Sequence, residues 1–264
     1  MSYKALGEAE AELAELNHRN LIDCVMSDDI DTLIFGAQCL IRIERPFKAK
    51  KSTVCDNVYI YTSQAIENSD SIGLTHAGLI FVALVNGGDY HDGLEQFGIK
   101  TAIALACCGF GDSLSNAFKN LAEPELATFL QSWWRSIRHE LQSNSQGYMT
   151  NQNPSLACQI TESFPDLQVL SLYVNPVTSW SPGQVPPDTS RWYPHLPQLW
   201  LVAQFAVEHL FPTHQQYLKV FHKHLFPKMA YRLITFGAPM YDAKTQHIHG
   251  LLADAAVTKI YPQP

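Results

Sequence analysis

The sequence predicts an α/β fold whose parallel sheet is followed by a helical extension. Short apolar and β-branched runs alternate with helical patterns over the first part of the chain, as is typical of strands and helices that succeed each other in an α/β sheet. Beyond Gly111 the strand pattern stops and apolar residues recur at helical spacing. With 264 residues and 46% hydrophobic content, the chain is long enough for one main domain and an extension.

The elements of the first part follow from periodicity and turn signals. Ala9, Leu13 and Leu16 recur on one face of a helix. The run Leu21–Met26 is apolar and ends in the polar residues 27–29, so it predicts a buried strand that enters a loop. The predicted elements here are a helix at 7–17, strands at 21–26, 39–43 and 58–61, and a helix at 74–85.

The second part is predicted to be helical. A proline in the first turn marks a helix start at Glu123, and an apolar stripe continues to Leu141. Trp133 lies on this stripe and is expected in the core, whereas Trp134 is offset and is expected to pack on the linker that follows. The other predictions are a polar linker at 143–155, a loop rich in proline and serine at 175–197, helices at about 198–210 and 214–226, and short strands after Tyr231.

Composition restricts the function classes. A net charge of −7 and a pI near 5.8 argue against a protein that coats DNA nonspecifically. Positive charge is concentrated in the stretch 42–51. The six cysteines show no CxxC spacing, so reduced intracellular thiols are expected. The N-terminal residues form no apolar signal region and no run is long enough to span a bilayer, so we expect a soluble protein.

Acidic residues in three short motifs are the strongest functional signal. The motifs are GEAEAELAEL (7–16), SDDIDTLIFGA (27–37) and LVNGGDYHDGLEQFGIKTA (84–102). Magnesium prefers hard oxygen ligands, and sites that cut phosphodiesters commonly hold two ions. Asp29 and Asp31 are two residues apart, so both can face one ion in an extended chain. The candidate metal ligands are Glu8, Glu10, Asp29, Asp31 and Asp89.

Each motif also has an ordinary interpretation. Taken alone, the glutamates of 8–15 are typical of a solvated helix face, and residues 28–31 of a turn or a helix cap. The Glu8 and Glu10 side chains diverge inside a regular helix, so they converge only if Glu8 lies at the first turn. Asp89 follows two glycines, whose missing side chains permit a close approach of the backbone. Three such segments in this order favour the metal site.

The three motifs together resemble the internal region of the XPG/flap-endonuclease superfamily of structure-specific nucleases. GGDYHDGL, ACCGFGDSL (106–114), WWRSIRHEL and SFPDLQVLSLYVNP resemble the Holliday-junction resolvase branch in fungi. The resemblance is strong over roughly residues 5–112 and implies a partial PIN-like nuclease core. It also implies that Mg²⁺, or Mn²⁺, binds at the five acidic positions and serves catalysis there.

The resemblance further implies two aspartates from a region that precedes the internal region. No candidate for them lies upstream of Gly7, so we expect this chain to correspond to the C-terminal portion of a nuclease that lacks the N-terminal nuclease region. The expected activity is cleavage of branched double-stranded DNA, such as Holliday junctions or 5′ flaps, in nuclear DNA repair and recombination. A dimer on a four-way junction and no membrane partner are expected. The alternative is a noncatalytic DNA-binding or interaction remnant.

Residues 93–102 resemble the helix–two-turns–helix of the family, which grips duplex DNA through a bound K⁺ ion. Glycines in the turns let backbone amides at the start of the second helix face a phosphate. A simple packing corner is the alternative interpretation. Arg42–Lys51 is predicted either to contact the DNA backbone or to form a solvated loop. The candidate DNA-binding residues are Gly93, Gly98, Lys100, Thr101, Arg42, Arg45 and Lys48.

The expected domain organisation has three parts. Residues 1–115 form the nuclease core with its helix–two-turns–helix, and residues 116–180 form a helical extension with a linker. Residues 181–264 form a C-terminal helical segment, in the place where a chromo-like domain follows the core in the resolvase branch.

Overall fold

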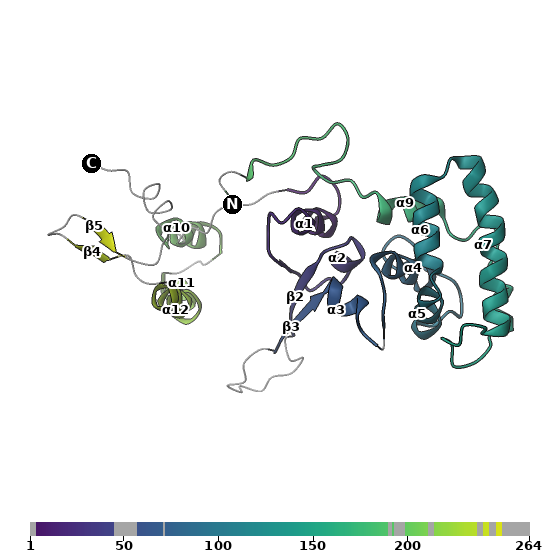
Figure 1. The fold of residues 1–264 in the computed structure, drawn as a ribbon. Helices are drawn as coiled ribbons and strands as arrows, with labels where there is room; N and C mark the ends of the chain where they lie inside the picture. The colour runs from purple at the N-terminus through teal and green to yellow at the C-terminus, as the bar shows by residue number, and fades with distance from the viewer. Residues whose placement is uncertain are drawn as a thin grey trace. The chain divides into compact units, whose positions relative to one another are not determined.

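The computed structural model describes residues 4–44, 57–70, 72–189, 192, 199–210, 214–236, 240–242 and 247–249. The chain divides into two compact units, Met1–Arg191 and Trp192–Pro264 (Figure 1). The expected DNA contacts at Arg45 and Lys48 lie outside the described residues. The division at 115/116 and 180/181 stays a prediction.

A small mixed sheet lies in the first unit. Its strands are β1 (Val25–Met26), β2 (Cys39–Glu44) and β3 (Asn57–Thr62), in the order β1-β2-β3. β1 and β2 run parallel, whereas β2 and β3 are antiparallel. The predicted α/β class is confirmed, but the sheet is not parallel throughout. The prediction of a parallel sheet is therefore wrong for β3, which pairs with β2 in antiparallel register from Cys39 opposite Thr62 to Glu44 opposite Asn57.

The predicted strand Leu21–Met26 shrinks to two residues because a side chain intervenes. Asn17 is buried, and its Nδ2 donates to the carbonyl oxygens of Ile22 and Asp23, 3.0 Å from each. Its Oδ1 accepts from the backbone amides of Gln38 and Cys39. The carbonyls before β1 are therefore satisfied by a side chain, so they do not extend the sheet.

Three helices pack around the sheet. They are α1 (Ala9–His18), α2 (Asp31–Ile34) and α3 (Ser63–Glu67). Ala14, Val25 and Leu40 belong to the small buried core here and are almost wholly inaccessible to solvent. The buried Glu12 of α1 reaches a distant part of the chain, because its Oε2 accepts from the backbone amide of Ser179 at 2.9 Å. This bond closes a span of 167 residues within the first unit.

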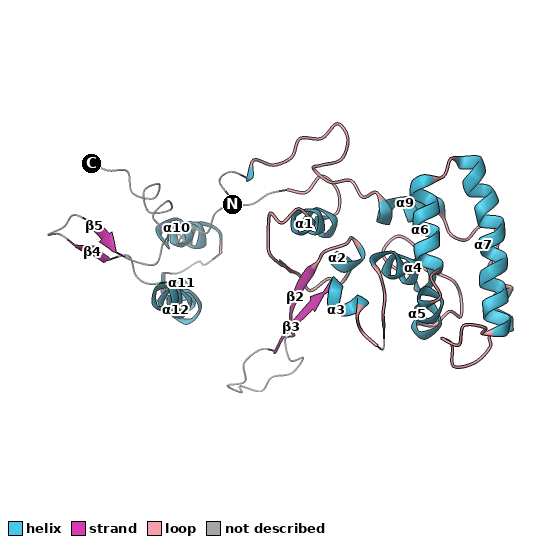
Figure 2. Ribbon diagram, viewed as in Figure 1, coloured by secondary structure: helices cyan, strands magenta, loops and turns pink. Residues whose placement is uncertain are grey.

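The rest of the first unit is mainly helical (Figure 2). It holds the larger hydrophobic core. Trp133 is buried in it as predicted. Trp134 is buried in the same core. Its Nε1 donates to the carbonyl of Phe164, which lies outside the linker 143–155 on which Trp134 was predicted to pack. The helices are α4 (His76–Asn86), α5 (Ile99–Cys107), α6 (Phe110–Asn120), α7 (Glu123–Ser143), α8 (Pro154–Ala157) and α9 (Leu167–Val174).

The second unit contains helices and a short hairpin. α10 (Leu199–His209) and α11 (His214–Val220) match the predicted helices, but the second one continues through a π-helical turn, η2 (Phe221–Leu225), into α12 (Phe226–Phe236). The strands expected in the tail are present as β4 (Met240–Asp242) and β5 (His247–His249), which pair antiparallel. Among the described residues, no helix combines the length and the apolar character that crossing a membrane requires.

Candidate functional site

The first acidic pair lies where α1 begins. Glu8 is the N-cap residue of α1 and has extended backbone angles, φ −66° and ψ 134°. Glu10 lies in the first turn of the helix and is half-buried, whereas Glu8 is exposed. The change from extended to helical backbone at Glu8 removes the divergence that a regular helix would impose on this pair.

The second acidic pair follows β1. The amide of Asp31 donates to Oδ1 of Asp29 at 2.9 Å, and the amide of Asp29 donates to Oγ of Ser27 at 3.0 Å. Thr32 is fully buried and its hydroxyl donates to the carbonyl of Asp29. These bonds fix the loop and place Asp31 at the first residue of α2.

Asp89 lies in a tight turn after α4. Gly88 and His91 form an antiparallel bridge around it, with Gly88 N donating to the His91 carbonyl at 2.9 Å. Gly87 precedes the turn at φ 93°, in the left-handed region that favours glycine. Asp89 is exposed at the tip of the turn.

Electrostatics connects these three segments at Asp31. Burial raises the pKa of the Asp31 carboxyl, and the negative charges of Asp29, Asp89, Glu10 and Glu8 raise it further, in that order. An exposed charge acts strongly only over about a Debye length, which is about 8–10 Å at moderate salt. The four other acidic side chains predicted as ligands therefore lie near enough for their charges to act on Asp31. We refer to these five carboxylates as the acidic cluster.

Glu8, Asp29 and Asp89 of the acidic cluster are exposed to solvent. Within the described part of the chain, no three His, Cys, Asp or Glu side chains form a group arranged to hold a metal ion. Like charges repel each other when no cation lies between them. The donors are nevertheless of the hard oxygen type that Mg²⁺ and Mn²⁺ prefer.

Two tyrosines that the sequence did not single out border the acidic cluster. Tyr90 makes a hydrogen bond to Glu8, and burial together with the charge of Glu8 raises the pKa of Tyr90 to about 12. The rings of Tyr90 and Tyr173 meet edge to face, with centroids 4.9 Å apart. Tyr173 comes from α9, far along the chain, and its buried hydroxyl has no hydrogen-bond partner among the described residues. An unpaired polar atom at this position fits a site that receives a further polar group.

The segment 93–102, predicted as a helix–two-turns–helix, runs from the turns that follow α4 into the first residues of α5. Gly93 has φ 78°, and a Cβ added there would lie 2.4 Å from the backbone nitrogen of Gly87. Gly98 differs, because its φ is −81° and a Cβ would meet nothing within 4 Å. The glycine at 93 is therefore required by geometry, whereas Gly98 leaves the backbone open at the start of α5.

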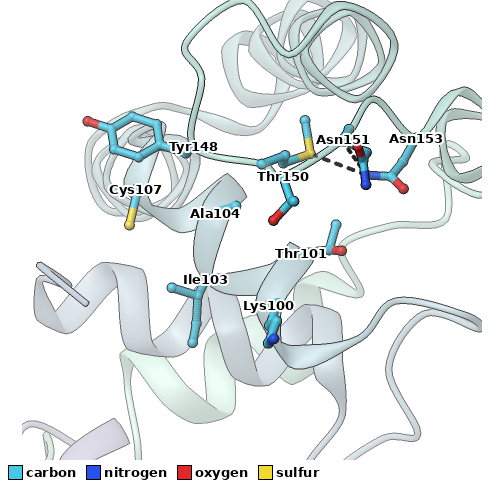
Figure 3. A pocket seen from close by; sticks show the side chains of 10 residues that line it. Lys100, Thr101, Ile103, Ala104, Cys107, Tyr148, Thr150, Asn151 and Asn153 are labelled. Atoms are coloured by element: carbon cyan, nitrogen blue, oxygen red, sulfur yellow. Dashed lines mark hydrogen bonds between the residues drawn. The ribbon is translucent and has the colours of Figure 1, made fainter. Parts of the chain in front are cut away.

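A groove runs along α5 (Figure 3). It has a volume of about 430 Å³. Lys100 and Thr101 line it from the first turn of α5, and the segment 148–153 lines it from the other side with Tyr148, Thr150 and Asn151. Lys100 is exposed, Thr101 is half-buried, and the first amides of a helix have no acceptor within it. The groove thus combines one cation, hydroxyls and amides, which are groups that bind phosphates.

The basic stretch is described only at its start. Arg42 lies on β2, is half-buried and pairs in register with Tyr59 of β3. The charges of Glu8, Glu10, Asp29 and Asp89 thus act on Asp31, whereas Lys100 and Thr101 line the groove and Arg42 lies on the sheet.

Known proteins resemble this chain in sequence and in structure. The XPG I-region family matches residues 2–89. Flap endonuclease 1 of Sulfurisphaera tokodaii is 35% identical over 107 residues, which cover 39% of this chain and 30% of the relative. Flap endonuclease GEN-like 1 of Arabidopsis thaliana is 36% identical over 103 residues, which cover 39% of this chain and 16% of the relative. The chain thus spans less than a third of either relative.

Solved structures agree. The eukaryotic junction-resolving enzyme GEN-1, in a structure with cesium, aligns with a TM-score of 0.61 at 30% identity, over 77% of this chain and 48% of that one. The catalytic core of Rad2 in complex with a DNA substrate aligns with a TM-score of 0.51 at 22% identity, over 84% of this chain and 62% of that one, and this likeness concerns the fold alone. In sequence and in structure, this chain is similar to members of the XPG/flap-endonuclease superfamily, among them the junction-resolving enzyme GEN-1.

Proposed function

We propose that this chain carries the internal-region carboxylates of a Mg²⁺-dependent, structure-specific endonuclease that cuts branched DNA in repair and recombination. The observation that supports it most is the raised pKa of Asp31, to which four other carboxylates from three separate segments contribute. Perturbed carboxylates in such a cluster are typical of functional sites. The substrates proposed are Holliday junctions and 5′ flaps, with two copies acting on a junction, in the nucleus.

The acidic cluster would hold the divalent cations through Glu8, Glu10, Asp29, Asp31 and Asp89. A bound divalent cation offsets the charge of the scissile phosphate and lowers the pKa of the attacking water. Without a cation, the same carboxylates repel the DNA backbone. The residues themselves therefore position cations and admit the phosphate, and they need not transfer protons. Structures of GEN1 with product DNA contain Mg²⁺, or Mg²⁺ and Mn²⁺, which supports both as cofactors.

Duplex DNA would be held along α5. Lys100, Thr101 and the open backbone at Gly98 offer a positive charge, a hydroxyl and amides to phosphates. GEN-1 has been solved with potassium, which supports K⁺ at the helix–two-turns–helix in this chain. Arg42, Arg45 and Lys48 are proposed as further contacts to the backbone.

The test is cleavage of a labelled four-way junction and a labelled 5′ flap in Mg²⁺. The double variant Asp29→Asn, Asp31→Asn is expected to lose at least about 100-fold in rate, because cation ligands are removed. Asp28→Asn is the matched control, since Asp28 is an exposed neighbour that does not contribute to the pKa of Asp31, and it is expected to cut normally.

Other outcomes separate the alternatives. Binding of both substrates without cutting would favour the noncatalytic DNA-binding remnant. Equal cutting by the double variant would reject the acidic cluster as the active site.

A further inference from the structure

We propose that Tyr173 is a positioning residue of the cation site, whose hydroxyl donates a hydrogen bond to the carboxylate of Asp31 or Asp89 when a divalent cation is bound. This inference rests on the proposed function and adds to it a residue from α9, outside the three acidic motifs. Five observations about Tyr173 support it: its burial, its unpaired hydroxyl, its closeness to Gly88, its aromatic neighbours and the charges around it.

The first two observations concern the hydroxyl itself. Tyr173 is 1% exposed, and its hydroxyl oxygen has no hydrogen-bond partner in the described part of the chain. Leaving a buried hydroxyl without a partner costs about 1–3 kcal/mol. A phenylalanine would fill the same space without this cost, so the hydroxyl is not explained by packing.

The third observation is where the hydroxyl points. A Cβ added at Gly88 would lie 2.6 Å from the hydroxyl oxygen of Tyr173 and 3.9 Å from its Cζ. The hydroxyl therefore lies against the backbone of the residue that precedes Asp89. Because a Cβ at position 88 would clash with this oxygen, a glycine there lets the Tyr173 hydroxyl approach the backbone so closely.

Aromatic contacts hold the ring in place. Its centroid lies 4.9 Å from that of Tyr90, which directly follows Asp89. The ring centroid of Phe35 lies 5.9 Å from that of Tyr173. Phe35 follows directly after α2, the helix that begins with Asp31. The ring is thus fixed between residues that neighbour two of the acidic segments, as required of a residue that orients a ligand.

The charges around Tyr173 determine which role its hydroxyl can take. Burial raises the pKa of Tyr173 to about 12, and the negative charges of Asp31 and Asp89 contribute. The hydroxyl therefore keeps its proton at neutral pH and acts as a donor beside two carboxylates. Carboxylates that bind metal ions are themselves held by hydrogen bonds from surrounding groups, and loss of such a bond weakens metal affinity about 10–100-fold.

The test compares Tyr173→Phe with the wild-type protein in two measurements. Titration calorimetry with Mn²⁺ reports the affinity of the site, and thermal unfolding without metal reports stability. We expect the affinity of Tyr173→Phe to fall about 10–100-fold, while its metal-free Tm is unchanged or higher because an unpaired hydroxyl is removed. Tyr231→Phe, at an exposed tyrosine of α12, is expected to change neither.

The remaining outcomes separate this inference from the proposed function. Wild-type affinity for Mn²⁺ in Tyr173→Phe, or a fall in its metal-free Tm alone, would overturn the role of Tyr173 and leave the acidic cluster intact. If the wild-type protein bound no Mn²⁺, both the role of Tyr173 and the proposed function would be rejected.

Discussion

At the scale of single residues, Asp31 is the carboxylate on which the repulsion by neighbouring negative charges acts. Burial and four neighbouring carboxylates raise its pKa. A raised folded pKa means that the folded protein binds this proton more tightly than the unfolded chain does. Stability therefore falls as the pH rises from the unfolded value of about 3.9 through the folded one, and above the folded pKa the loss is complete.

Removing this charge is expected to stabilise the metal-free protein. Asp31→Asn should raise the free energy of unfolding at pH 7 by about 0.5 kcal/mol, a modest value because the side chain is partly solvated. The gain should vanish below about pH 4, where the aspartate is protonated in both states. Thermal unfolding of both proteins from pH 3 to 8 measures this. A lower Tm of Asp31→Asn at pH 7 would show that a partner stabilises the charged carboxylate.

Gly88 and Tyr173 should be coupled. Gly88→Ala places a methyl group against the Tyr173 hydroxyl, which we expect to cost about 1–3 kcal/mol, as overpacking does. In Tyr173→Phe the same methyl meets Cζ at an ordinary 3.9 Å, so the double variant should recover most of the loss. Urea unfolding of the four proteins gives the coupling energy. Gly98→Ala, into open space, is the control and should change stability little. Additive losses would argue against the contact.

The sequence could identify the carboxylates but not the tyrosines around them. Acidic residues at strand ends and glycine turns mark candidate ligands because backbone geometry is local. Tyr173 acquires its place only through packing against residues more than eighty positions earlier, such as Tyr90 and Gly88. No periodicity within α9 carries that information, because Val169, Leu170 and Tyr173 are simply the buried face of a helix.

At the scale of elements, helices were more predictable than strands. The long amphipathic helix α7 begins at the predicted Glu123, where proline follows in the first turn. β1 was predicted too long, because the amide of Asn17 takes the carbonyls that a strand would offer to a neighbour. The antiparallel direction of β3 also depends on how the chain returns after β2, which an apolar run does not specify.

The end of α7 gives a prediction about the groove. Glu140 is 2% exposed, accepts from the Ser145 hydroxyl and accepts from the Gln146 amide at 3.0 Å. It therefore holds the turn that leads to the groove segment 148–153. Glu140→Ala should lower the free energy of unfolding by about 2–3 kcal/mol, because hydrogen bonds to a buried charge are lost.

Denaturant unfolding checks the effect of Glu140→Ala. His139→Ala, at the exposed neighbouring position, is the matched control and should lose under about 0.5 kcal/mol. Equal effects of the two substitutions would mean that the loss reflects helix propensity and not the bonds of Glu140.

At the scale of the whole molecule, the acidic cluster depends on the complete first unit, Met1–Arg191. The acidic motifs occupy its early part, yet Tyr173 and Ser179 come from its end. The resemblance of the first third to a family domain indicated where the carboxylates are. It could not indicate that later helices complete the core around them, since such contacts join residues far apart in sequence.

Two shortened chains test this dependence. A chain of residues 1–191 should unfold in one cooperative transition, since it contains the whole first unit. A chain of residues 1–175 lacks the Ser179 amide that Glu12 requires, so it should be less stable by about 2 kcal/mol or more. Calorimetric unfolding compares them. Equal Tm values would show that Glu12 finds another donor.

The bond between Glu12 and Ser179 also bears on synthesis at the ribosome. Glu12 emerges long before Ser179 is made, and at about 5–20 residues per second the intervening 167 residues take roughly ten to thirty seconds. Throughout that interval the carboxylate of Glu12 stays hydrated, because its partner amide does not yet exist. The first helix of the nascent polypeptide therefore lacks this hydrogen bond to the rest of the unit. Translation speed over this stretch therefore sets how long the unfinished chain is open to chaperones and proteases.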